Sequence, residues 1–157
     1  MLHFSEWALV GRMALATFLG YLIGFEREWR GKPAGERTFA LIGLGAAAFT
    51  SIGAAESVAG ATRVIQGVVA GVGFLGAGLI FREASGGVMG LTTAASSWAV
   101  AAVGVLVGAG AYAAAAAATL LVLLILEINR LPVLRRIERG RRRADRGPDG
   151  GGPDGRD

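Results

Sequence analysis

Five long apolar segments follow one another along the chain, separated by short polar or glycine-rich stretches. They cover Trp7–Gly24, Thr38–Ala55, Val64–Phe81, Val88–Val107 and Ala111–Ile128. The hydrocarbon core of a bilayer is about 30 Å thick, and a helix needs about 20 apolar residues to cross it. Each segment is close to that length. The pattern predicts an all-α, polytopic membrane protein with a bundle of five transmembrane helices.

The last two apolar segments are predicted to be separate helices. A single helix over both would hold about 40 residues, and at about 1.5 Å per residue it would reach roughly twice the hydrocarbon thickness. Gly108-Ala109-Gly110 lies between them, and glycine is a weak helix former. We therefore expect the chain to turn at these residues.

The segment between the first two apolar runs, Gly24–Thr38, holds seven charged residues in fifteen positions, which predicts a short loop outside the hydrocarbon. Lys and Arg are retained on the cytoplasmic side of membrane proteins, so the basic residues of alternate loops indicate orientation. This loop, Arg82 and the C-terminal tail hold nearly all of them, whereas the opposite set of loops holds Arg63. We expect the N-terminus outside and the C-terminus in the cytoplasm.

The composition changes near residue 130, which predicts a membrane domain at 1–130 and a basic tail at 131–157. The tail is rich in Arg, Gly, Pro and Asp, and it carries most of the net charge of +4. Such a segment has little apolar area to offset the entropy of ordering, so we expect disorder from about Arg143. Its arginines favour contact with anionic membrane lipids. Nucleic-acid binding is the weaker alternative, because no aromatic residues alternate with the arginines as a stacking surface requires.

Glycines recur at helical spacing within the apolar segments, in the pairs Gly20 and Gly24, Gly67 and Gly71, and Gly104 and Gly108. Small residues at this spacing let helices approach closely in a membrane. The third segment is the densest, and we expect its glycines to pack it against neighbouring helices: Gly67, Gly71, Gly73, Gly76 and Gly78. The alternative is that this helix unwinds over Gly71–Gly78 and offers carbonyl groups to an ion or substrate.

The candidate chemistry gathers at the ends of helices that are expected to face the cytoplasm. Three acidic residues stand among the four basic residues of the charged loop, and acidic residues add little to orientation. Their presence predicts specific ion pairs, and Glu26 with Arg30 and Glu28 with Lys32 are four apart in the favourable order. We interpret this region as a candidate functional surface made of Glu26, Arg27, Glu28, Arg30, Lys32, Arg37, Arg82, Thr92 and Thr93.

Residues for catalysis or metal binding are scarce. The chain has no cysteine, its one histidine is His3, and no nucleophile has a base at a suitable spacing, so we expect neither an enzyme nor a cofactor. Mg²⁺ is normally held by carboxylates or phosphates, and no predicted span has an acid near its middle. The one charge clearly within a span is Arg12. It is either a structural anchor, which extends to the membrane surface or pairs with an acid such as Glu6 or Glu56, or a functional residue.

Three segments together resemble the MgtC/SapB family of bacterial membrane proteins. They are 24–38, Gly73–Arg82 and Gly90–Trp98, and their order and spacing also match over about Leu9–Leu126. The resemblance implies a five-span protein of the bacterial inner membrane. It is closest to the short members of the family, which lack the soluble C-terminal domain of the name-giving type.

The resemblance also implies a function. It points to a non-enzymatic regulator in a virulence-associated family, linked to magnesium homeostasis and adaptation to low magnesium, that acts on another membrane complex such as the ATP synthase. The alternative is a small transporter or channel for Mg²⁺ or another cation that works as a homo-oligomer.

Overall fold

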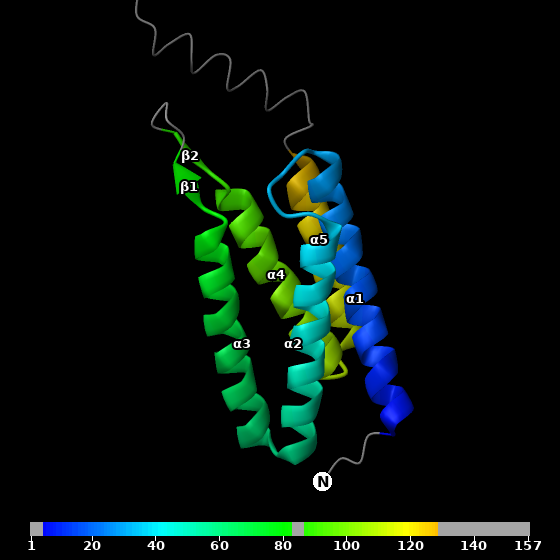
Figure 1. Ribbon diagram of the computed structural model, residues 1–157. Helices are drawn as coiled ribbons and strands as arrows, with labels where there is room; N and C mark the ends of the chain where they lie inside the picture. Colours follow the sequence, from blue (N-terminus) through cyan, green and yellow to red (C-terminus); the bar gives the residue numbers. More distant parts are fainter. Residues whose placement is uncertain (1–4, 83–86, 129–157) are drawn as a thin grey trace, which may run out of the picture. The chain divides into compact units, whose positions relative to one another are not determined.

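The computed structural model describes residues 5–82 and 87–128 of the chain. Its elements are α1 (Glu6–Trp29), α2 (Glu36–Glu56), α3 (Val58–Gly78), β1 (Phe81–Arg82), β2 (Val88–Met89), α4 (Leu91–Gly108) and α5 (Tyr112–Glu127) (Figure 1). Helices α1 to α4 are long and apolar enough to cross a membrane, whereas α5 is a shorter apolar helix. The predictions of an all-helical membrane protein and of five helices are confirmed for the described residues, whereas four of the five predicted membrane spans have the length to cross a membrane.

The chain forms two compact units, Met1–Leu123 and Leu124–Asp157. The first unit contains α1 to α4, the β1–β2 hairpin and most of α5. In the second unit the described residues are the end of α5 and Ile128. The basic tail predicted at 131–157 lies outside the described residues.

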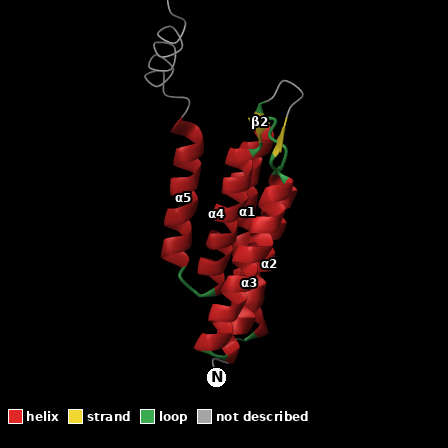
Figure 2. Ribbon diagram, turned by 90° about the vertical axis from the view of Figure 1, so that its left-hand side faces the viewer, coloured by secondary structure: helices red, strands yellow, loops and turns green. Residues whose placement is uncertain are grey.

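Helices α2 and α4 form the inner part of the first unit. α1 packs along α2, α2 also contacts α3 and α4, and α4 contacts α1 and α3 (Figure 2). About 56% of the apolar stretch of α4 is buried, compared with 11% of that of α3. Helix α3 therefore leaves most of its surface without contact to the described chain.

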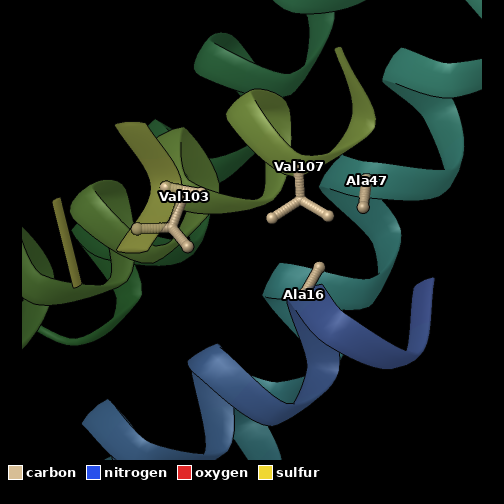
Figure 3. Packing of buried hydrophobic residues seen from close by; sticks show 5 residues of the cluster. Ala16, Ala47, Val103 and Val107 are labelled. Carbon is tan, nitrogen blue, oxygen red and sulfur yellow. The ribbon is translucent and has the colours of Figure 1, made fainter. Parts of the chain in front are cut away.

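The core between α1, α2 and α4 is built from small side chains. Figure 3 shows Ala16 of α1, Ala47 of α2, and Val103 and Val107 of α4 meeting in one cluster, and all four are fully buried. Glycines bring the backbones close: a Cβ atom added at Gly43 would lie 2.5 Å from the carbonyl oxygen of Ala16. The helices therefore pack backbone against backbone, as small residues allow in membranes.

The glycines of α3 do not pack as predicted, with one exception. A Cβ atom added at Gly76 would lie 3.7 Å from Ala94 of α4. At Gly67, Gly71, Gly73 and Gly78 no atom of the described neighbours lies within 4 Å of such a Cβ, because α3 meets α2 and α4 along other positions. Close approaches between helices occur instead at Gly20, Gly24, Gly43, Gly104 and Gly108, and between Gly53 of α2 and Gly60 in the first turn of α3. Helix α3 is also continuous through Gly78, in contrast to the alternative of a local break.

Three helix boundaries differ by several residues from the sequence prediction. α3 begins at Val58, six residues before the predicted start at Val64, so Arg63 lies within this helix and not in a loop. α1 continues through Gly24–Trp29, so the first part of the charged segment is helical and the loop is shorter than expected. Val88 and Met89 do not begin α4. They form β2, which pairs antiparallel with β1 in a short hairpin. α4 begins after Gly90, whose φ of 87° and close approach to the carbonyl oxygen of Leu79 exclude any other residue without a shift of the chain.

Arg12 holds the turn between α4 and α5. Its Nη1 donates to the carbonyl oxygen of Gly108 at 2.6 Å, and its Nε donates to the hydroxyl of Tyr112 at 3.1 Å. Gly108 ends α4, and a cation is favourable at the C-terminus of a helix. Ser51 of α2 donates to the same carbonyl at 3.1 Å. These contacts favour the structural interpretation of Arg12.

Candidate functional site

The charged loop and the hairpin lie at the same end of the first unit (Figure 1). Helix α1 ends and α2 begins at this end, and α3 ends and α4 begins there too. The chain therefore brings together the charged loop after α1, the hairpin after α3 and the first turn of α4. Most of the residues that the sequence analysis singled out lie at this end. Their positions are not equivalent, because some are buried in the helix bundle and others are exposed.

Four of these residues form one group, here called the Arg27 cluster: Glu26, Arg27 and Arg30 from the end of α1, and Thr93 from the first turn of α4. Arg27 is 3% exposed. Its Nη1 lies 3.5 Å from Oε2 of Glu26, and its Nη2 donates to Oγ1 of Thr93 at 3.4 Å. Arg30 pairs with the other carboxylate oxygen of Glu26. The pair of Glu26 with Arg30 was predicted from their spacing.

The charges of the Arg27 cluster are not balanced by its own members. One carboxylate faces two guanidinium groups, and Glu26 divides its two oxygens between them. The contacts of Arg27 are longer than the roughly 2.7–2.9 Å typical of charge-assisted hydrogen bonds, and its Nε has no hydrogen-bond partner among the described residues. Because removing a charge from water costs several kcal/mol unless a close partner compensates it, Arg27, whose carboxylate partner is shared with Arg30, is a costly residue to place here.

The sequence of α1 explains why Arg27 is buried. The buried residues of this helix recur every three or four positions, and Arg27 is the last member of this stripe: Ala16, Gly20, Ile23, Gly24 and Arg27. Gly24 allows α2 to approach, since an added Cβ would lie 2.6 Å from Cα of Glu36. Arg27 was predicted to lie on an exposed surface, and the structure buries it. The helical phase that it shares with Gly20 and Gly24 was the signal for its burial.

Glu28 has a different role at the same end of the unit. Its Oε2 accepts a hydrogen bond from the backbone N–H of Glu36 at 3.2 Å. Glu36 begins α2, and the preceding Gly35 offers no side chain as a cap. A carboxylate at this position satisfies a free donor and complements the positive end of the helix dipole. Glu28 thus fixes the start of α2, and the predicted pair with Lys32 is not formed among the described residues.

The remaining predicted residues are exposed or undescribed. Lys32 and Arg37 are exposed. Thr92 is exposed on the first turn of α4, and its carbonyl accepts a hydrogen bond from Ser96 Oγ at 2.7 Å. Arg82 lies in β1, and its side chain is outside the described part of the structure. The predicted surface therefore divides into the buried Arg27 cluster and an exposed part, whose basic residues Lys32 and Arg37 are here called the basic rim.

A groove between α2 and α3 was not anticipated from the sequence. Its volume is about 730 Å³, and its walls are almost entirely apolar, including Leu41, Phe49, Val64 and Leu75. Gly67 and Gly71 also line it, which explains why their spacing coincides with no helix contact. In a bilayer such a groove is filled by apolar groups. Within the described residues no group of three or more acidic or histidine side chains could hold a metal ion.

Comparison with known proteins matches residues 13–134 to the MgtC family. Protein SrpB of Synechococcus elongatus is 42% identical over 121 residues, which cover 68% of this chain and 66% of SrpB. Protein MgtC of Brucella abortus is 52% identical over 99 residues, and protein MgtC of Salmonella typhimurium is 47% identical over 97. Each match covers 62% of this chain but 41% and 42% of the two MgtC proteins, so the chain spans less than half of their length. No solved structure matches the chain.

Proposed function

Because the chain belongs to the MgtC family, we propose that this multi-pass membrane protein is a non-enzymatic regulator that acts on another membrane complex during adaptation to low magnesium. In this proposal the protein resides in the bacterial inner membrane, with its N-terminus outside and its C-terminus in the cytoplasm. The ATP synthase is the proposed target. The proposed contact surface is the cytoplasmic end that carries the Arg27 cluster and its exposed basic rim.

The observation that carries this proposal is that buried polar residues and exposed basic and aromatic residues lie next to each other at that end. The Arg27 cluster is buried and fixed between α1 and α4, so it holds the end of the bundle in one arrangement. Around it, Lys32, Arg37 and Trp29 are exposed, and Trp29 has 75% of its surface accessible. Arginine and aromatic residues presented on a rigid support are typical of protein interfaces.

A transport function for a single copy of the chain has less support. A path for Mg²⁺ requires carboxylates or other oxygen ligands, and the described interior between α1, α2 and α4 is filled by Ala, Val and Gly in close contact. The buried hydroxyls of Ser96 and Ser97 donate to carbonyls of their own helix at 2.7 Å, so their protons are already engaged. The alternative function is a cation transporter whose path forms between several copies.

Flux and crosslinking together test the proposal. Purified full-length protein in liposomes that contain a Mg²⁺-sensitive dye is expected to give no more Mg²⁺ entry than empty liposomes. A photo-crosslinking residue at Lys32 is expected to capture a subunit of the ATP synthase in cells starved of magnesium. The same residue at Ala59, exposed at the opposite end of the bundle, serves as the control and is expected to capture none.

Mg²⁺ entry that rises in proportion to the amount of protein would replace the regulator with the transporter. Equal capture of the ATP synthase from Lys32 and Ala59 would show that the contact is not made through the proposed end.

A further inference from the structure

The first turn of α4 is a helix N-terminus without a side-chain cap. Its N-cap residue is Gly90, which offers no side-chain acceptor. Helix geometry leaves the first N–H groups without partners inside the helix, here those of Leu91, Thr92 and Thr93. No other residue fits at Gly90, because an added Cβ would collide with the carbonyl oxygen of Leu79. The fold therefore prevents the usual Ser, Thr or Asp cap.

Arg27 points at this same turn. Its guanidinium group reaches Oγ1 of Thr93, the third residue of α4, at 3.4 Å. The residue is 97% buried, since 3% is exposed, and its Nε has no hydrogen-bond partner among the described residues. A buried cation and the positive end of the α4 dipole thus face each other with one shared carboxylate, Glu26, beside them. Two positive groups in contact favour a further anion beside Glu26.

We propose that the first turn of α4 and the Arg27 cluster form a binding site for a phosphate group. Backbone N–H groups at a helix N-terminus bind the oxygens of phosphate, and the planar guanidinium group of arginine matches two phosphate oxygens at once. The outer part of the site reaches the surface, where Leu91 is 58% exposed, Thr92 is exposed and Arg30 keeps 21% of its side chain accessible, whereas Arg27 and Thr93 form its buried floor.

This inference goes beyond the proposed function and does not depend on it, since a phosphate group could occupy the site in a regulator or in a transporter. The site lies at the end of membrane-spanning helices, where the headgroups of phospholipids and the phosphates of the aqueous phase both reach. The shared chemistry is a phosphate oxyanion. The two sources are an anionic phospholipid and a free phosphate.

Thermal unfolding of the purified full-length protein in a neutral detergent tests the proposal. One series adds sodium phosphate and compares it with sodium chloride at equal ionic strength, and the other adds phosphatidylglycerol and compares it with phosphatidylcholine. A ligand that binds only the folded state raises Tm as its concentration increases. We expect phosphate, phosphatidylglycerol or both to raise Tm above their controls, and the series that responds identifies the source.

Variants locate the response. Arg27→Gln is expected to weaken the apparent affinity for the active probe by about tenfold to a hundredfold, the loss expected for one charge-assisted contact. Arg30→Gln is expected to weaken it as well, because Glu26 then neutralises Arg27 alone. Arg63→Gln, which removes the same charge at an exposed position on α3, is expected to respond like the wild type. Any binding to the arginines of residues 130–156 persists in all three variants and is subtracted with the control.

The proposal is overturned if neither probe raises the Tm of the wild type above its control. It is equally overturned if Arg30→Gln and the folded Arg27→Gln protein respond like the wild type. Because Arg30 is partly exposed, its variant gives a result even where Arg27→Gln does not fold.

Discussion

Replacing Gly104 with leucine is expected to remove the folded protein from the membrane. A Cβ atom at this position would lie 2.6 Å from the carbonyl oxygen of Gly43 and 2.7 Å from Cβ of Ala46, both on α2. Backbone atoms cannot yield as a flexible side chain does, so α2 and α4 must separate. Overpacking by single methylene groups already costs about 1–3 kcal/mol, and leucine adds four carbons. The measurement is the amount of monodisperse protein after extraction in mild detergent.

Gly67→Leu is the matched control for this substitution. It makes the same change in a membrane helix, at a position where no described neighbour lies within 4 Å of an added Cβ. Its side chain projects into the apolar groove between α2 and α3. We expect a yield and a Tm close to those of the wild type. A Gly104→Leu protein with the yield of Gly67→Leu would contradict the packing of α2 against α4.

Glu26→Gln is expected to destabilise the fold strongly. The substitution removes the carboxylate that neutralises Arg27 and Arg30, and leaves Arg27 as an uncompensated buried charge. Breaking a buried ion pair costs about 3–5 kcal/mol. The side chain of Glu26 is 11% exposed, so we expect the lower end of this range, about 3 kcal/mol. The measurement is Tm in detergent, which should fall by several degrees.

Glu28→Gln is the control for the loss of an acid at the same end of α1. Glu28 is exposed and caps α2 through one hydrogen bond, so we expect a cost below about 1 kcal/mol. The two variants separate an effect on stability from an effect on activity. Because Glu28→Gln is expected to stay folded, its failure to support growth at low magnesium would indicate a loss of activity. An equal Tm for Glu26→Gln and Glu28→Gln would contradict the central place of Glu26 in the cluster.

The helices could be predicted from the sequence because their signal is local. A run of about 20 apolar residues is needed to cross hydrocarbon wherever it occurs, and the turn at Gly108–Gly110 follows from length alone. The pair of Glu26 with Arg30 also needed only the helical repeat and one condition, that α1 continue past Gly24. The structure meets this condition, since α1 ends at Trp29.

The partners of each helix face could not be predicted in the same way. Gly67 and Gly71 have the same spacing as Gly104 and Gly108, yet only the second pair meets another backbone. Glycines four residues apart show that one face of a helix lacks side chains. The arrangement of the other helices decides what packs against that face. Similarly, β1 and β2 have two residues each, too few for an alternating pattern. The helical phase of Arg27 indicates the buried face of α1, but its contact with Thr93 depends on where α4 lies.

We expect the end of the bundle that carries the Arg27 cluster to face the cytoplasm, where a regulated complex or a phosphate group can reach it. The chain has no cysteine, so a single introduced cysteine reports on one position. Lys32 lies in the loop beside the cluster, and Ala59 lies exposed at the opposite end of the unit. Each is replaced by cysteine, and intact cells are treated with a membrane-impermeant maleimide.

We predict that the cysteine at position 59 reacts in intact cells and that the cysteine at position 32 reacts only after the inner membrane is permeabilised. Reaction at position 32 in intact cells, with protection at position 59, would place the Arg27 cluster on the outer side of the membrane and rule out a cytoplasmic contact surface.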